Sequence, residues 1–449
     1  MEQNFFYIDL VWLTGCVAIG LTFFAYRRSG DIFHPAIFLG IPLAYPYFLA
    51  PLLLNDKGIL DLYLPMESMP YVQLIDLLGI AALLLGTLVV KRPPVNFYEP
   101  TLWSKGLVRP LRSAALLLGT VGVIGYLFSV YSSGGFMEVY SVSHNREGLG
   151  VSGYIRNLSM FLIPAILLLF LSSSGRRLKP LELGLIAFFA APIIIRSILA
   201  GARGPTFVIL VTLVVGWYMS RGTRPPLTVV LGGGMALAFL LLFFVTHRDV
   251  LHLGAQFEYK GIDEAIEFME RDSRGHEYIY GSGTIINAIR TEDYEWGGRY
   301  IVKIIIRAIP SFLWPSQYED AQEFLGLPQA RLTAQVATLG WSATGGASTG
   351  LIADLWRQCW WYYLLVLYSV GWVFGIVWNR AVSRGGIWFV GYVLLVAMSL
   401  YLTQQTIQAW LWQIFFLGGT SWIVWRWKIY PWLQKIQAYI YAQQHGMLQ

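Results

Sequence analysis

Cysteine is nearly absent from this chain, with Cys16 and Cys359 the only two among 449 residues. Both lie in or beside apolar runs, far apart in the sequence, which argues against a structural disulfide and against a thiol-bound metal. The sequence also lacks an HExxH motif, a carboxylate run with metal-ligand spacing and a GxSxG nucleophile elbow. These absences argue against metal-dependent and acyl-serine mechanisms, so we expect neither a metal nor another cofactor.

Charge is scarce as well, since only 13% of the residues are charged while 56% are hydrophobic. Together with a mean hydropathy of +0.55, this composition predicts a polytopic membrane protein. The net charge of +6 comes without a basic block long enough to follow a phosphate backbone, so no nucleic-acid partner is expected. The first residues, MEQNFFYIDL, lack the basic region of a cleaved signal peptide. We therefore expect the first apolar run to remain as an anchor.

Apolar windows of about 20 residues predict an all-α fold with about eleven transmembrane helices, within a range of 10–13. We expect one transmembrane domain over residues 1–449. The predicted spans are 7–26, 33–54, 71–90, 113–131, 153–172, 182–200, 204–220, 227–246, 359–379, 387–404 and 407–425.

Short basic loops alternate with loops that are poor in lysine and arginine, and this alternation predicts the orientation of the helices. The basic loops, which include Arg176 and Arg177 and later Arg380 and Arg384, are predicted to face the cytoplasm. The N-terminus then lies outside. The tail 427–449 has apolar residues on one helical face and is predicted to lie along the inner membrane surface.

Residues 247–358 form the one long polar stretch between apolar runs, and the alternation of basic loops predicts that they lie outside. We expect a large outer loop or re-entrant region that contains short amphipathic helices. Ionisable groups held between hydrophobic walls are the first place to look for a functional site.

Arginines at the outer end of the sixth predicted span indicate one candidate site. Arg196 and Arg203 are predicted to lie on the outer side, although the basic loops that set the orientation lie on the cytoplasmic side. An arginine at the rim of an apolar helix is costly unless it is paired or solvated. One interpretation is an anion site, where guanidinium groups bind phosphate oxygens bidentately. The other is that the side chains snorkel to lipid headgroups.

A second cationic group follows a four-residue period, because Arg299, Lys303 and Arg307 fall on one side of a predicted helix that Pro310 ends. The helix either lies on anionic lipid or is buried with its cations facing a cavity. In the second case the five cations together would bind a diphosphate.

Candidate proton carriers come from the start of the same stretch, where His247, Asp249, His252, His276 and Glu277 occur. Glycine and tyrosine surround His276 in SRGHEYIYGSG, which suits a loop that approaches a sugar. A base within hydrogen-bond reach of an acceptor hydroxyl is needed for glycosyl transfer. His276 and Glu277 are therefore catalytic candidates, with a solvated loop histidine as the alternative.

A Gly/Ser/Thr cluster before the ninth predicted span indicates a loop that caps the next helix near Ser348 or Thr349. Asp354 then lies one turn inside the helix and is the third catalytic candidate, with a simple pairing to Arg357 as the alternative. Three aromatic residues of the polar stretch are predicted to stack on sugar faces, namely Tyr280, Trp296 and Trp341.

In this arrangement the chain resembles the Wzy-type oligosaccharide repeat-unit polymerases, also called O-antigen polymerases. The resemblance covers ten or more spans, a large outer loop late in the chain, and diffuse motifs. These motifs are Gly201-Ala202-Arg203-Gly204, the pattern from Tyr280 through Arg307 and Pro310 to Trp314-Pro315, and a Gly-x-Ser segment followed by Gly-x-x-x-Asp-x-Trp around Asp354.

The resemblance implies a multi-pass enzyme of the bacterial inner membrane that joins undecaprenyl-diphosphate-linked repeat units at the periplasmic face. Its donor and acceptor would both be lipid-linked oligosaccharides, and a chain-length regulator and a flippase would be possible partners beside membrane lipid. Related O-antigen ligases use arginines for the diphosphate and a loop histidine as base, which implies a diphosphate role for Arg203.

Two alternatives remain beside a metal-independent polymerase. An O-antigen ligase-type transferase would differ in its acceptor. A non-catalytic transporter or flippase of lipid-linked sugars would place ionisable groups near mid-bilayer in paired broken helices. The ionisable groups of this chain gather on one face instead, which favours an enzyme.

Overall fold

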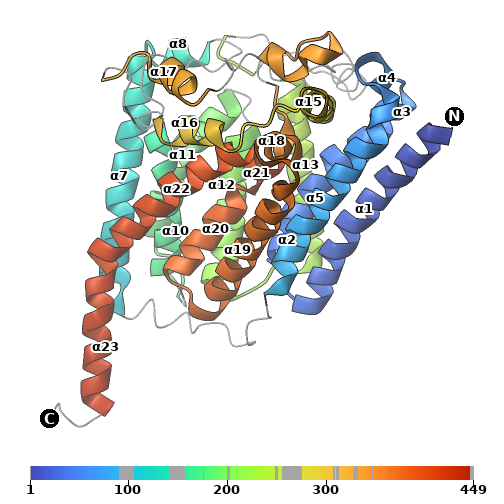
Figure 1. Cartoon of the computed structure of the whole chain (residues 1–449). Coiled ribbons are helices and arrows are strands. Elements are labelled where there is room, and N and C mark those ends of the chain that lie inside the picture. Colours follow the sequence, from blue (N-terminus) through green and yellow to red (C-terminus); the bar gives the residue numbers. More distant parts are fainter. Residues whose placement is uncertain are drawn as a thin grey trace. The chain divides into compact units, whose positions relative to one another are not determined.

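The computed structural model describes residues 2–90, 106–141, 157–174, 176–199, 203–247, 251–254, 276–306, 309, 313–326, 332–344 and 347–444. Within these ranges the chain forms helices joined by short segments, and no β-strand occurs (Figure 1). The prediction of an all-α fold is therefore confirmed for the described residues.

Seven helices of the described chain are long and apolar enough to cross a membrane. They are Phe6–Ser29, Pro35–Asp56, Met66–Val89, Val108–Ser132, Pro180–Leu199, Gly350–Arg384 and Ile387–Gln404. Each overlaps one of the predicted spans. The other four predicted spans also contain helices, but these are not among the seven. The structure thus supports a multi-pass membrane protein, while the count of eleven remains a prediction.

The chain divides into two compact units. Unit 1 contains residues 1–92, 260–376 and 398–412. Its helices are α1 (Glu2–Ser29), α2 (Pro35–Ala44), the π-helix η1 (Tyr45–Leu49), α3 (Ala50–Asp56), α4 (Leu60–Tyr63), η2 (Met66–Ser68), α5 (Met69–Val89), α15 (Glu277–Thr291), α16 (Gly298–Ile304), α17 (Gln317–Phe324), η6 (Leu332–Leu339), α18 (Gly350–Cys359), η7 (Trp360–Tyr362) and α21 (Ser399–Gln404). Helix α19 (Tyr363–Arg384) begins in unit 1, and α22 (Ile407–Val424) also begins there.

Glycines allow α5 and the first part of α19 to approach closely. A Cβ on Gly86 would lie 2.2 Å from the carbonyl oxygen of Tyr368, and a Cβ on Gly371 would lie 2.0 Å from that of Leu83. Small residues at helix crossings are the usual solution in membranes, where packing rather than water exclusion holds helices together. This crossing holds α19 against α5.

A buried hydrogen-bond network holds α15 against the N-terminal helices of unit 1. The hydroxyl of Tyr278 lies 2.8 Å from that of Tyr7 and donates to Gln73 Oε1 at 2.8 Å. Gln73 Nε2 in turn donates to the hydroxyl oxygen of Thr14 at 2.8 Å. Since unpaired polar groups are costly when they are buried, these bonds specify how α1, α5 and α15 pack.

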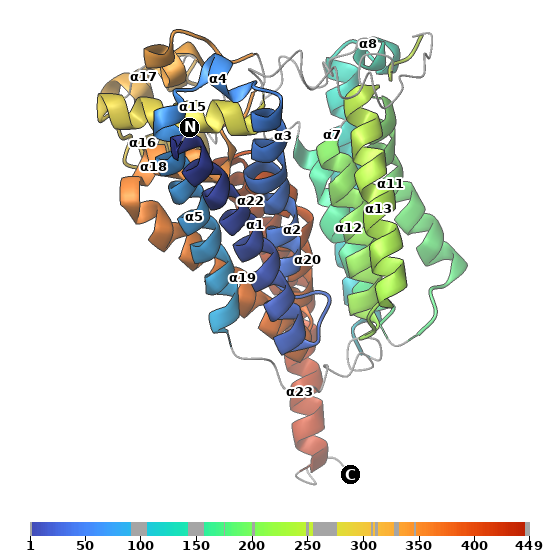
Figure 2. The same cartoon turned by 90° about the vertical axis from the view of Figure 1, so that its right-hand side faces the viewer.

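Unit 2 contains residues 93–259, 377–397 and 413–449. Its helices are α7 (Val108–Ser132), α8 (Phe136–Tyr140), η3 (Leu158–Phe161), α10 (Leu162–Ser172), α11 (Pro180–Leu199), α12 (Arg203–Ser220), α13 (Leu227–Thr246), α20 (Ile387–Ala397), the π-helix η8 (Trp425–Ile429) and α23 (Tyr430–Gln444). Helix α10 packs against α7, α11 and α12 in this unit. Figure 2 shows α7, α11 and α12 side by side. All residues of α10 are buried, as its unbroken apolar sequence predicts.

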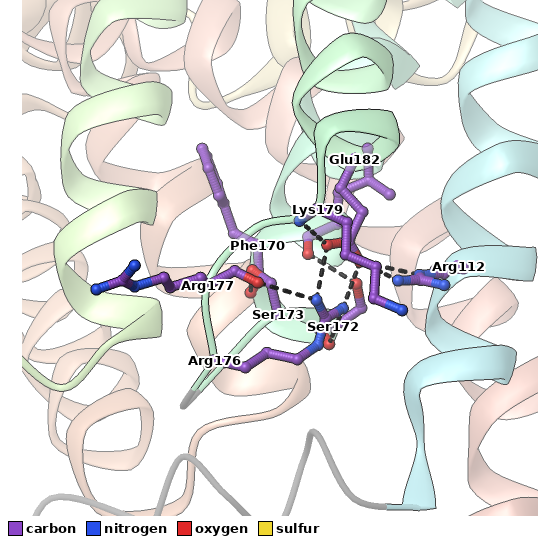
Figure 3. A network of polar contacts seen from close by, with 9 residues as sticks. Arg112, Phe170, Ser172, Ser173, Arg176, Arg177, Lys179 and Glu182 are labelled. Carbon is purple, nitrogen blue, oxygen red and sulfur yellow. Dashed lines mark hydrogen bonds and ion pairs between the residues drawn. The ribbon is translucent and has the colours of Figure 1, made fainter.

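A carboxylate bound by two arginines ties α7 to the start of α11 in unit 2, and we name Arg112, Arg176 and Glu182 the Glu182 cluster (Figure 3). Arg112 Nε donates to Glu182 Oε1 at 2.9 Å, and Arg176 Nη1 donates to Oε2 at 2.8 Å. The backbone N–H of Lys179 also donates to Oε2, at 2.9 Å. The Glu182 side chain is only 2% exposed. Its charge is paired with Arg112 of α7 and with Arg176 of the basic loop before α11.

Candidate functional site

Helix α15 begins where the sequence suggested a loop, and its N-cap is His276. The Nδ1 atom of His276 accepts a hydrogen bond from the backbone N–H of Tyr278 at 3.2 Å, which satisfies one of the first free donors of the helix. Glu277 follows in the first turn, where an acid complements the helix dipole. The expectation of a loop around His276 is therefore wrong from Glu277 onward, because this cap starts a helix that is buried from Tyr278 to Ala288.

Glycine explains how α15 comes so close to the segment before α18. A Cβ on Gly281 would lie 2.5 Å from the carbonyl oxygen of Thr349, and one on Gly283 would lie 2.9 Å from the side chain of Val336. The YGSG sequence therefore serves close helix packing, not a flexible loop.

Helix α18 begins at Gly350 with Thr349 as its N-cap, which confirms the predicted position of the cap. The backbone N–H of Gly350 donates to Ser348 Oγ at 3.3 Å. Asp354, Arg357 and Gln358 are spaced three and four residues apart, so they share one face of this helix.

Glu295 is the centre of the polar contacts on that face, and we name Glu295, Arg299, Arg357 and Gln358 the Glu295 cluster. Its Oε1 atom accepts from Arg299 Nη2 and forms an ion pair with Arg357 Nη2 at 2.9 Å. Its Oε2 atom accepts from Gln358 Nε2. All four residues are at least nine-tenths buried, with exposures of 5%, 7%, 6% and 1% in sequence order. One buried carboxylate thus connects the start of α16 to α18.

The Glu295 cluster lines a cavity of about 130 Å³ within unit 1. This volume is well above the roughly 10–15 Å³ that a single water requires. The remaining lining residues are mostly polar and come from α15, α18, the segment before α18 and the start of α22. They are Tyr280, Thr284, Ala347, Thr349, Asp354, Thr406 and Gln408.

Asp354 is the half-buried acid of this cavity, and Tyr300 holds it in place. The Tyr300 hydroxyl donates to Asp354 Oδ2 at 2.7 Å. Burial and the adjacent Asp354 carboxylate raise the pKa of Tyr300 well above its usual value, so the hydroxyl keeps its proton at neutral pH. Burial likewise raises the pKa of Tyr280 to about 12. The Tyr300 hydroxyl therefore stays a hydrogen-bond donor to Asp354.

Among the predicted catalytic residues, only Asp354 belongs to the lining of this cavity. His276 and Glu277 lie at the first turn of α15, where Glu277 Cγ would be 3.4 Å from a Cβ on Gly350. These two candidates thus lie near the start of α18, one turn before Asp354, but outside the cavity lining. Arg357, which the alternative interpretation paired with Asp354, forms an ion pair with Glu295.

The predicted diphosphate ligands fall into different surroundings. Arg299 lies in the cavity lining but is paired with Glu295. Arg196 is half-buried on α11, which belongs to unit 2. The side chains of Arg203 and Lys303, and the whole of Arg307, lie outside what the structure describes.

Helix α16 ends at Ile304, earlier than the expected stop at Pro310. The β-branched run Ile304-Ile305-Ile306 explains part of this difference, because such residues lose side-chain freedom in a helix. Arg299 and Lys303 of the predicted cationic stripe lie on α16, while Arg307 and Pro310 lie outside the described residues.

The predicted sugar-stacking residues also separate. Tyr280 lines the cavity and is 1% exposed. Trp341 packs edge-on against Tyr63, with ring centroids 5.7 Å apart, and donates from Nε1 to the Tyr63 carbonyl at 2.9 Å. Trp296 is 63% exposed and lies near the rings of Tyr294 and Tyr362.

The sequence did not indicate Glu295, Gln358, Thr284 or Gln408 as site residues. One signal could have indicated them: Glu295 and Arg299 are spaced i, i+4, and so are Asp354 and Gln358, which is the spacing of neighbouring side chains on a helix. Neither spacing reveals that the two segments meet, which requires the contact between residues 63 positions apart.

Comparison with family models, with curated proteins and with solved structures yields no match to this chain. The residues and their geometry are therefore the basis for the functional proposal.

Proposed function

We propose that this chain is a polysaccharide polymerase of the bacterial inner membrane that joins undecaprenyl-diphosphate-linked repeat units at the periplasmic face. The observation that supports it most is the cavity in unit 1, where two acids, two buried arginines and hydroxyl-bearing side chains meet. Perturbed and converging polar groups of this kind are typical of active sites. In this proposal the chain has about eleven spans, and residues 247–358 face the periplasm.

Asp354 acts as the general base in this proposal. The acceptor hydroxyl attacks the anomeric carbon of the donor sugar while its proton passes to Asp354. The bond from the anomeric carbon to the diphosphate breaks with inversion, and the lipid diphosphate leaves. Tyr300 orients the carboxylate through the 2.7 Å hydrogen bond to Oδ2. A positioned base contributes about 10²–10⁴-fold to such a step.

The leaving diphosphate requires cationic side chains to stabilise its charge. Arg299 is bound to Glu295 within the cluster, so its charge is largely compensated. Arg196, Arg203, Lys303 and Arg307 remain the predicted diphosphate ligands, because guanidinium and ammonium groups stabilise charge that develops on phosphate oxygens. His276 and Glu277 remain alternative bases, although the capping bond of His276 gives its Nδ1 atom a structural role.

The test uses purified protein in nanodiscs with one defined lipid-diphosphate-linked repeat unit, and mass spectrometry counts the joined units. We expect wild-type protein to form products of two and more repeat units and Asp354→Asn to lower the rate by about 10²–10⁴-fold. Asp61→Asn, at an exposed position of the same unit, is the matched control and should keep the wild-type rate.

The outcomes also separate the alternatives. Near-normal turnover by Asp354→Asn would remove the cavity from the chemistry. Transfer to a lipid acceptor without a diphosphate, but not between repeat units, would identify a ligase. Movement of the intact lipid-linked sugar across the bilayer without any new glycosidic bond would identify a transporter.

A further inference from the structure

The cavity has no excess of positive charge. Its charged lining residues are two guanidinium groups, Arg299 and Arg357, and two carboxylic acids, Glu295 and Asp354. A third acid, Asp293, has Oδ2 at 3.9 Å from Arg357 Nη2. A diphosphate would bring further negative charge next to these carboxylates, and like charges in a partly desolvated site repel strongly. The balance favours a neutral ligand.

Two buried polar atoms of the lining have no hydrogen-bond partner among the described residues. One is the donor Arg357 Nη1, and the other is the acceptor Gln358 Oε1. The assignment of the Gln358 amide is constrained, because its Nε2 faces the Glu295 carboxylate, which only accepts. Buried polar atoms without partners are costly unless a ligand or water completes them.

The combination of a free donor and a free acceptor distinguishes between ligand classes. Phosphate oxygens only accept at neutral pH, so a phosphate could satisfy Arg357 Nη1 but would leave Gln358 Oε1 unpaired. A hydroxyl both donates and accepts. Two hydroxyls of one sugar ring can therefore satisfy both atoms, because Arg357 and Gln358 both contact the same Glu295 carboxylate.

We propose that this cavity is the acceptor subsite of the polymerase and binds an uncharged pyranose ring through neighbouring hydroxyls, one accepting from Arg357 Nη1 and one donating to Gln358 Oε1. This inference rests on the proposed function for the name of the subsite. Glu295 is the positioning residue of the subsite, because it occupies Arg357 Nη2 and Gln358 Nε2 and leaves the other atom of each side chain for the ligand.

A binding experiment tests the subsite without requiring turnover. Saturation-transfer NMR on the full chain in nanodiscs compares a panel of uncharged methyl pyranosides with inorganic pyrophosphate. We expect at least one pyranoside to bind and Arg357→Lys to weaken that binding by about tenfold or more, as for the loss of a hydrogen bond to a charged group. Pyrophosphate should not displace the bound pyranoside.

A second variant distinguishes loss of binding from misfolding of the buried cluster. Gln408 lines the cavity but is only half-buried, so Gln408→Leu should weaken pyranoside binding while unfolding at the wild-type temperature. Gln405→Leu, at an exposed position nearby, is the control and should bind normally.

Binding of pyrophosphate that Arg357→Lys removes, without binding of any pyranoside, would overturn the inference, and so would binding of neither probe. These results are distinguishable from failure of the proposed function. Pyranoside binding with the expected mutant effects, in a chain that joins no repeat units, would support the sugar subsite and reject the polymerase.

Discussion

Glu182 in unit 2 and Glu295 in unit 1 are both buried glutamates that form ion pairs with two arginines. In the Glu182 cluster, both carboxylate oxygens are occupied, and Arg176 also donates to the carbonyl oxygens of Ser172 and Arg177. No buried side-chain atom of that cluster lacks a partner within the described chain. The Glu295 cluster lines a cavity and leaves one donor and one acceptor unpaired.

The difference shows how similar residues serve distinct purposes. An arginine–glutamate cluster whose hydrogen bonds are all made within the chain holds helices together. A cluster that leaves polar atoms unpaired beside a cavity needs a ligand or water to complete it, because leaving buried polar atoms unpaired costs about 1–3 kcal/mol each. We therefore regard the Glu182 cluster as structural and the Glu295 cluster as part of a binding site.

The largest expected contrast comes from the same substitution in each cluster. Arg357→Lys keeps a positive charge beside Glu295 but loses the second guanidinium nitrogen, so turnover should fall by about 10²-fold or more. Arg112→Lys should change turnover by less than about threefold, since a lysine retains the charge next to Glu182. The measurement is repeat-unit joining by purified protein. Equal losses in the two variants would remove the distinction between the clusters.

Removal of the central charge sharpens the comparison through stability. Glu295→Gln leaves two arginines whose side chains are 9% and 8% exposed without their counter-charge, and it should destabilise the fold by about 3–5 kcal/mol. Glu182→Gln should cost less, about 1–3 kcal/mol, because Arg112 and Arg176 are 32% and 26% exposed and water can solvate them.

Thermal unfolding of the purified proteins in one detergent gives the loss of stability of both variants. Asp61→Asn is the reference substitution. A larger loss for Glu182→Gln than for Glu295→Gln would mean that exposure does not govern the cost of these buried carboxylates.

The smallest expected effect concerns the packing that brings α15 to the cavity. Gly281→Ala places a Cβ 2.5 Å from the Thr349 carbonyl oxygen, and relieving this overlap should cost about 1–3 kcal/mol. Gly184→Ala adds a methyl group with no atom within 4 Å and should be neutral or slightly stabilising in its helix. Unchanged thermal stability and turnover in Gly281→Ala would show that α15 can move without affecting the site.

Much of the fold was predictable because its signals are local. Apolar runs located the helices, and the Gly/Ser/Thr cluster located the start of α18 at Gly350. The helix at Glu277–Thr291 was missed, because YGSG resembles a loop unless the close contact of Gly281 with Thr349 is known.

The candidate site was less predictable because its centre depends on a long-range contact. Glu295 is one of several acids in TEDYEWGG, and nothing local distinguishes it from Glu292 or Asp293. Its place in the cavity lining depends on contacts with Arg357 and Gln358, which lie on α18. Asp354 could be found from the sequence, whereas its partner Tyr300 could not, since the two are 54 residues apart.

The most direct measurement maps where the substrate binds. A lipid-diphosphate-linked oligosaccharide with a photoreactive group on its non-reducing sugar is crosslinked to the wild-type protein in membranes, and the labelled peptides are identified by mass spectrometry. The account predicts label within residues 276–306 and 347–358, with competition by unmodified repeat unit. Label confined to residues 106–112 and 172–182, around the Glu182 cluster, would contradict it.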